Sequence, residues 1–240
     1  MAKYMIEPVG VEFNASQLGG CEHSQVLQLM GVKAPPYSAE MQALFKRALL
    51  NEDLVKSTLV INKVPMAFCD DSDRLRLALR DCMKVGDQEY ALKINCVTDG
   101  VLFYETPWND SCWRDSGYVP FKEPAKLHKQ VAAFEHKYFS KASWDEFLAN
   151  ELEQFPQYRF QLAIQQHCLQ EYFELEYTPP IVFSVEQADC EEGKHPQRIY
   201  RIYEEPFYTK RKIFERCESI VRNWKMQYVP DCSNPKFCAY

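Results

Sequence analysis

Residues 89–105, EYALKINCVTDGVLFYE, contain two apolar runs that are separated by Thr98-Asp99-Gly100. Short runs of this kind, rich in apolar and β-branched residues and bounded by turn residues, are typical of β-strands. An Asp-Gly pair between two such runs is a common signal for a tight turn. The stretch therefore predicts a β-hairpin, and the fold must include at least one sheet.

Upstream of this hairpin the pattern alternates between strand and helix. Residues 1–20 alternate apolar and polar side chains as a half-buried strand does, and residues 22–30 predict a short helix. Ser38 is well placed to cap a second helix. Residues 57–68 predict a strand or a buried connection, and the apolar residues within 71–83 predict a third helix.

Downstream of residue 122 the sequence has a more helical character. Residues 126–138 predict a helix, and the S-x-x-E sequence from Ser143 resembles a capping box for the helical pattern that follows. Residues 181–185 and 198–203 predict two strands, and residues 210–224 predict a last amphipathic helix. The sequence thus predicts an α+β fold, with a mixed α/β N-terminal half and a more helical C-terminal half.

The composition excludes several classes of protein. The chain has 240 residues, of which 46% are hydrophobic and 26% are charged, as in a folded globular protein. Only 8 residues are glycine, and neither GxGxxG nor GxxxxGK[ST] occurs, so P-loop and dinucleotide-binding classes lack their main motif. The formal net charge of −6 gives no support for general binding of nucleic acid. The basic run at residues 210–212 is most simply a solvated helix face.

Cysteine usage and hydropathy predict a cytoplasmic protein. The N-terminal sequence has no apolar stretch that resembles a signal peptide, and no segment is apolar enough to predict a membrane span. The 10 cysteines include no CxxC pair, which is the usual spacing in zinc ribbons and fingers. The nearest candidates for metal ligands are His167-Cys168, Cys190 with His195, and Cys232 with Cys238, but no spacing rule selects a metal site. We expect reduced, mostly buried thiols in an intracellular compartment.

The loop that follows the hairpin, at residues 104–118, has the densest group of chemically distinctive side chains. It carries three carboxylates and two tryptophans: Glu105, Asp110, Asp115, Trp108 and Trp113. Carboxylates at a strand end beside flat aromatic rings are a common way to bind a polar ligand that contains a ring. The same pattern is also typical of a tryptophan-containing loop that packs on the core.

A second chemical element is the pair Glu22-His23 at the start of the first predicted helix. The helix dipole favours the ionised form of a carboxylate at this position. Such a carboxylate can orient a water molecule or accept a proton from it. The alternative is that Glu22 only stabilises the helix start and that His23 is solvated.

Together these two elements resemble the NADAR family of YbiA-like N-glycosidases. Members of that family open an early helix with Glu-His and later have an Ala-Leu-Arg helix. A strand ending in Glu then leads into a loop of the form Asn-Asp-x-x-Trp-Gly-Asp-Gly. Residues 78–80, 101–105 and 109–117 match these later features in the same order, and the resemblance covers about residues 1–120.

The resemblance implies an N-glycosidase-like hydrolase that acts on an ADP-ribosylated or ribosylated nucleobase. Nucleic acid would then be bound only as a modified substrate, and neither a metal nor a cofactor is required. The residues that it implies are Glu22 and Asp110 as catalytic groups, with His23, Glu105, Trp113 and Asp115 binding the substrate.

The resemblance also implies a division of the chain. Residues 1–122 would form a NADAR-like α+β domain, and residues 123–240 would form a mostly helical extension with a short strand pair. The chain departs from the family pattern in several places, and neither the N-terminal Ser-Asn-Phe segment nor the glycine-containing lead into the Glu-His helix is recognisable. Arg114 replaces a glycine, and no lysine follows Glu-His at the expected distance.

A non-catalytic role, as a viral or effector-type protein that binds a partner protein, is the alternative hypothesis. The C-terminal half has no recognisable catalytic motif, and it is rich in aromatic residues that are favoured at interfaces. These residues are Tyr172, Tyr177, Tyr200, Tyr203, Phe207, Tyr208 and Tyr228.

Overall fold

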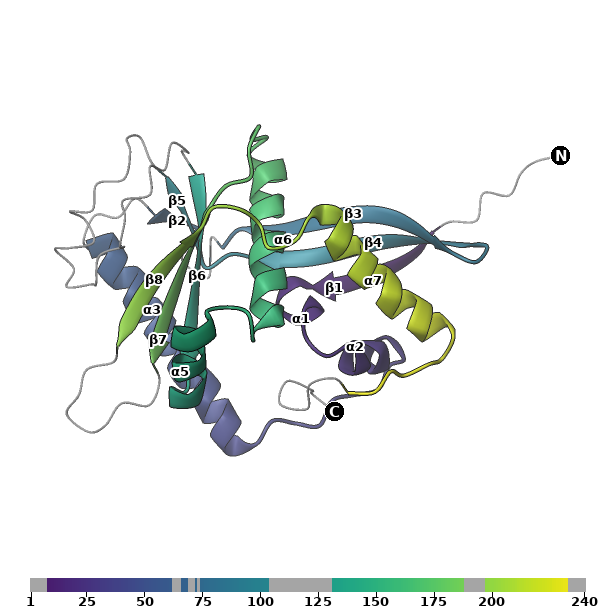
Figure 1. The fold of residues 1–240 in the computed structure, drawn as a ribbon, viewed down its shortest axis with the longest axis horizontal. Coiled ribbons are helices and arrows are strands. Elements are labelled where there is room, and N and C mark those ends of the chain that lie inside the picture. Colours follow the sequence, from purple (N-terminus) through teal and green to yellow (C-terminus); the bar gives the residue numbers. More distant parts are fainter. Residues whose placement is uncertain are drawn as a thin grey trace.

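A computed structural model describes residues 8–61, 66–68, 72, 74–103, 131–187 and 197–232. Two β-sheets lie on either side of one long helix, and another helix covers the far face of the larger sheet (Figure 1). No helix in these ranges is both long enough and apolar enough to cross a bilayer.

Helices and strands alternate irregularly along the chain, so the predicted α+β class is confirmed. The strands are β1 (Val9–Asn14), β2 (Met66–Ala67), β3 (Arg76–Val85), β4 (Gln88–Val97), β5 (Gly100–Phe103), β6 (Val131–Phe139), β7 (Ile181–Gln187) and β8 (Arg198–Tyr203). The helices are α1 (Ala15–Leu18), α2 (Glu22–Leu29), α3 (Ala39–Ile61), α5 (Lys141–Asn150), α6 (Pro156–Tyr172) and α7 (Lys210–Lys225).

The smaller sheet has the strand order β1-β4-β3, with β1 parallel to β4 and β3 antiparallel to it. Gly86, with a φ of +61°, makes the turn between β3 and β4. The sheet packs on α6 and α7 through a core that includes Ile94, Ile164 and Ile220. The predicted apolar face of α7 is confirmed, since its residues Ile213, Cys217, Ile220 and Val221 are buried.

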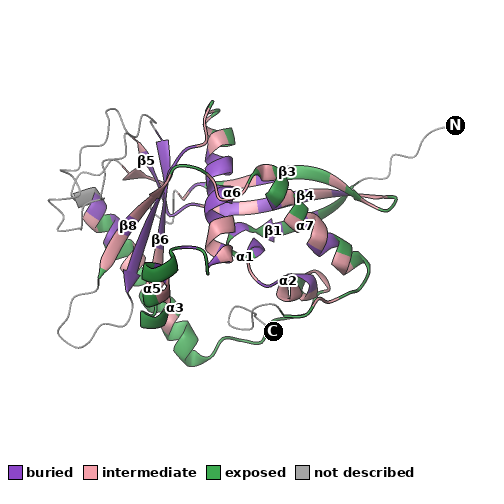
Figure 2. Cartoon of the chain, viewed as in Figure 1, coloured by how far each residue is buried: buried purple, intermediate pink, exposed green. Residues whose placement is uncertain are grey.

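The larger sheet has the strand order β2-β5-β6-β7-β8, in which only β6 and β7 are parallel. Helix α3 covers one face, where Leu59 packs with Phe134 and Val182. Helices α5 and α6 cover the other face, where Phe147 and Phe183 are fully buried. Strands β6 and β7 are buried along almost their whole length, whereas β4 of the smaller sheet alternates between buried and partly exposed residues (Figure 2).

The division predicted between residues 122 and 123 falls between two strands that pair in one sheet. Strand β5 precedes this point and β6 follows it, and the two strands are antiparallel neighbours. The segment from residue 123 onward contributes three strands, β6, β7 and β8, in addition to its helices.

Three predictions of local structure are wrong. Residues 76–80 lie in β3 and not in a helix, so the Ala-Leu-Arg segment at 78–80 is a strand. Residues 131–138 lie in β6, which is covered on both faces and therefore lacks the alternation that marks a half-buried strand. Residues 57–61 continue α3.

The predicted hairpin at Thr98-Asp99-Gly100 is also wrong, because β4 and β5 belong to different sheets. Thr98 and Asp99 are the two residues that carry the chain from one sheet to the other. Gly100 pairs with Phe134, and this register places Asp99 beside Glu135. Pairing between β5 and β6 stops there, so the second half of β6 has no described strand on that side.

The cap of α5 gives a local test of the fold. The side chain of Ser140, and not that of Ser143, accepts the hydrogen bond from the Ser143 backbone N–H. We expect Ser140→Ala to lower the free energy of unfolding by about 1 kcal/mol. Ser143→Ala, one turn later, should have a smaller effect. Urea unfolding of both variants measures the difference, and equal losses would contradict this assignment of the cap.

Candidate functional site

Two carboxylates and a lysine meet where the chain passes between the sheets. Asp99 precedes β5, and Glu135 and Lys137 lie in the neighbouring strand β6. Because side chains two residues apart point to the same face of a strand, Glu135 and Lys137 are on one face. That face is covered by α6, which contributes Gln161 and Gln165.

Glu135 is the centre of this cluster, and its side chain is only 1% exposed. Lys137 forms an ion pair with Glu135 Oε1, which also accepts a hydrogen bond of 2.7 Å from Gln161 Nε2. Gln165 Nε2 donates to Glu135 Oε2 at 2.5 Å and to the carbonyl oxygen of Val97 at 3.2 Å. The position of the Glu135 carboxylate is therefore fixed from two elements, β6 and α6.

Asp99 is buried beside Glu135 and is held by the backbone of β6. Its Oδ2 accepts a hydrogen bond of 2.9 Å from the His136 N–H. Burial and, after it, the negative charge of Glu135 raise the pKa of the Asp99 carboxyl to about 6, although Lys137 acts in the opposite direction. Two buried carboxylates thus share one lysine, and the cluster has an excess of negative charge.

Lys137 connects this cluster with the surface, since its side chain is 21% exposed. Burial alone lowers the pKa of Lys137, but Glu135 and Asp99 outweigh this effect, so the pKa is raised and the ammonium stays protonated. Its Nζ lies 5.5 Å from the centre of the Tyr158 ring. Tyr158 in turn lines a cleft of about 600 Å³ that is bounded by α1, α2 and the first turn of α6.

The cluster has the donor atoms that a hard divalent cation prefers. The N–H and the C=O of one strand residue point to the same edge, so the His136 carbonyl faces the side on which Asp99 lies. Carboxylate and carbonyl oxygens suit Mg²⁺, which commonly binds one or two protein carboxylates together with substrate phosphates and water. Within the described ranges no three His, Cys, Asp or Glu side chains gather as metal ligands.

His136 itself points to the opposite face of the sheet, beneath α3. Its Nδ1 lies 3.1 Å from Ser184 Oγ, and its side chain is buried. Burial lowers the pKa of His136 to about 3, and the nearby charges of Arg198, Lys137 and Lys56 act in the same direction. His136 is therefore neutral at physiological pH, and its side chain supports the sheet.

The predicted residues Glu22 and His23 lie elsewhere, at the start of α2, and both contact the C-terminal part of the chain. Glu22 forms an ion pair with Arg216. Its Oε1 accepts hydrogen bonds from Ser219 Oγ at 2.8 Å and from Asn223 Nδ2 at 2.7 Å. His23 Nδ1 lies 2.9 Å from the carbonyl oxygen of Pro230. These contacts attach α2 to α7 and to the tail that follows it.

The other predicted site residues, Glu105, Asp110, Trp113 and Asp115, lie outside the described residues. The N-glycosidase site that was expected from the NADAR resemblance therefore stays a prediction.

Sequence reasoning missed Glu135 and Lys137, although a signal was present. In VAAFEHKYF, residues 131–139, charged side chains interrupt an otherwise apolar run. In a helix, residues two apart do not face each other, so the helix prediction hid the pair. In a strand the same spacing places them side by side.

No family model and no curated protein matches this chain. The chain is similar to a solved structure described as "Crystal structure of SSO0001", with 12% sequence identity and a TM-score of 0.47. The match covers 95% of this chain and 85% of that one.

Proposed function

We propose that the protein is a divalent-cation-dependent hydrolase of phosphodiester bonds in nucleic acid. The observation that carries the proposal is the group Asp99, Glu135 and Lys137 at the junction of the two sheets. Burial and the adjacent carboxylate of Glu135 raise the pKa of Asp99, and a bound cation would relieve the repulsion between the two carboxylates. A lysine beside a cation supplies a second positive charge for a phosphate group.

Each residue has a distinct role in this proposal. Asp99, Glu135 and the His136 carbonyl bind the cation. A bound divalent cation lowers the pKa of a coordinated water and withdraws charge from the phosphoryl oxygens. Lys137, which stays protonated, stabilises the negative charge that grows on those oxygens as water attacks phosphorus and the P–O bond to the leaving group breaks. Gln161 and Gln165 hold the Glu135 carboxylate in position.

Cleavage assays on the purified full chain test the proposal. We expect Mg²⁺ or Mn²⁺ to support hydrolysis of single-stranded or double-stranded DNA or of RNA, and EDTA to abolish it. Lys137→Met should lower kcat by roughly 10²- to 10⁴-fold because it removes a charge that acts in the transition state. Lys141→Met is the matched control, since Lys141 is 60% exposed on α5 and pairs only with Asp145 among the described residues.

Two outcomes would contradict the proposal. One is the absence of cation-dependent cleavage for all these substrates, and the other is full activity of Lys137→Met. The same reactions can be analysed for released bases, which is the product that the N-glycosidase hypothesis requires. Base release that survives EDTA and is lost in Glu22→Gln would favour that hypothesis instead.

A further inference from the structure

Two cysteines from opposite ends of the chain meet at the start of α2. Cys21 is the N-cap residue of α2 and is 2% exposed. Cys232 is exposed and lies in the tail that follows α7. Their sulfur atoms are 3.5 Å apart, which is van der Waals contact and longer than an S–S bond of about 2.05 Å.

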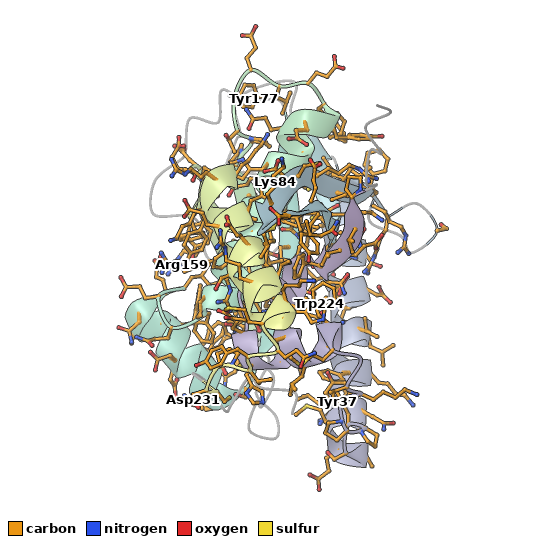
Figure 3. All side chains as sticks on the ribbon, turned by 90° about the vertical axis from the view of Figure 1, so that its right-hand side faces the viewer. Tyr37, Lys84, Arg159, Tyr177, Trp224 and Asp231 are labelled. Carbon is orange, nitrogen blue, oxygen red and sulfur yellow. The ribbon has the colours of Figure 1, made fainter. Side chains whose placement is uncertain are left out.

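The neighbouring contacts hold the tail in this place. His23 is bound to Pro230 two residues before Cys232, and Arg216 of α7 donates to the carbonyl oxygens of Leu18 and Gly20 just before Cys21. In the side view, the tail at Asp231 lies below the C-terminal half of α7, which is marked by Trp224 (Figure 3). Polar contacts next to Cys21 and next to Cys232 thus hold the two sulfur atoms near each other.

We propose that Cys21 and Cys232 form a reversible disulfide with a low-molecular-weight disulfide, such as oxidised glutathione, as the oxidant. The exposed thiolate of Cys232 attacks one glutathione sulfur, and a first glutathione thiol leaves. The thiolate of Cys21 then attacks Cys232 Sγ of the mixed disulfide, and the second glutathione thiol leaves. The two cysteines are oxidised, one glutathione disulfide is reduced, and the two cysteine protons end on the glutathione thiols.

The bond would fasten the C-terminal tail to the first turn of α2. It would join residues that are 211 positions apart, and a link over so long a segment restricts the unfolded chain strongly. Cys21 also lines the cleft that Tyr158 borders. Oxidation would therefore restrain the part of the cleft wall that Cys21 forms. The disulfide does not depend on the proposed hydrolase activity.

The test compares the full chain before and after incubation with oxidised glutathione. We expect a mass loss of about 2 Da, a cross-linked peptide that contains both Cys21 and Cys232, and reversal by dithiothreitol. The melting temperature should rise on the order of 10 °C on oxidation. Cys232→Ser, at an exposed position, should abolish the mass loss, the cross-linked peptide and the rise in melting temperature. Cys82→Ser, which removes another exposed thiol, should leave them intact.

Several results would overturn the proposal. One is that Cys21 and Cys232 are alkylated to the same extent before and after oxidation. Another is a disulfide between Cys232 and a different cysteine, such as Cys238. A stoichiometric transition metal in the purified protein, lost in Cys232→Ser, would also overturn it, because the thiols would then be metal ligands. Elemental analysis of the untreated protein decides this last point.

Discussion

Asp99→Asn and Glu135→Gln should each lower cation-dependent cleavage by roughly 10³-fold, because each removes a negative oxygen ligand of the cation. Both substitutions keep the size of the side chain, so the variants should fold. Initial rates over a Mn²⁺ titration measure the loss, and calorimetry should show weaker Mn²⁺ binding. Asp145→Asn is the control, since Asp145 is 55% exposed on α5.

The binding measurement separates the role of the cation from that of the substrate. A variant that keeps wild-type Mn²⁺ affinity but loses activity would show that the carboxylate acts on the substrate and not on the cation. If Asp99→Asn and Glu135→Gln both keep full cation-dependent activity, the proposed site is wrong.

The second large effect concerns stability in the absence of a cation. The pKa of Asp99 is raised from 3.8 to about 6 in the folded protein, so the folded state binds this proton more tightly than the unfolded state does. Stability is therefore lost as the pH rises from about 4 to about 6, and the full penalty of about 3 kcal/mol persists at neutral pH. Asp99→Asn removes the charge and should remove this penalty.

The expected result is a variant that is more stable than the wild type at neutral pH. In EDTA at pH 7.5, the melting temperature of Asp99→Asn should exceed that of the wild type by roughly 6–12 °C. At pH 4.5 the difference should be much smaller, because Asp99 is then mostly protonated in the folded state. Urea unfolding at both pH values gives the free energies, and the same difference at both would refute the argument. Mg²⁺ should stabilise the wild type more than the variant.

The sequence predicts best those elements that have either an amphipathic pattern or clear boundary residues. Helix α7 has one buried face and an exposed one, and its predicted range of 210–224 agrees with Lys210–Lys225. Strands β7 and β8 follow paired prolines and a polar loop, and both are confirmed. Strand β6 is covered by helices on both faces, so its burial pattern has no period from which a strand can be recognised.

The candidate site could not be predicted either, because its residues lie in segments whose local sequence fits more than one structure. In the sequence Asp99 stands in an Asp-Gly pair, which predicts a hairpin turn but here connects two separate sheets. The adjacency of Asp99 and Glu135 depends on a strand pair that joins residues 36 positions apart. Local sequence patterns carry no information on such pairing, because the two partners lie far apart in the chain.

Gln165 links the position of the Glu135 carboxylate to the distance between the two sheets. Its amide nitrogen holds the last carbonyl of β4 in one sheet and the Glu135 carboxylate of the other. Because Gln165 belongs to α6, the position of this helix between the two sheets determines the position of the Glu135 carboxylate. A substitution such as Ile164→Val, one residue away on the side that faces the smaller sheet, could change cation affinity through a shift of the whole helix. If the proposed cation site is correct, selection for packing in the core of this protein also acts on its cation affinity.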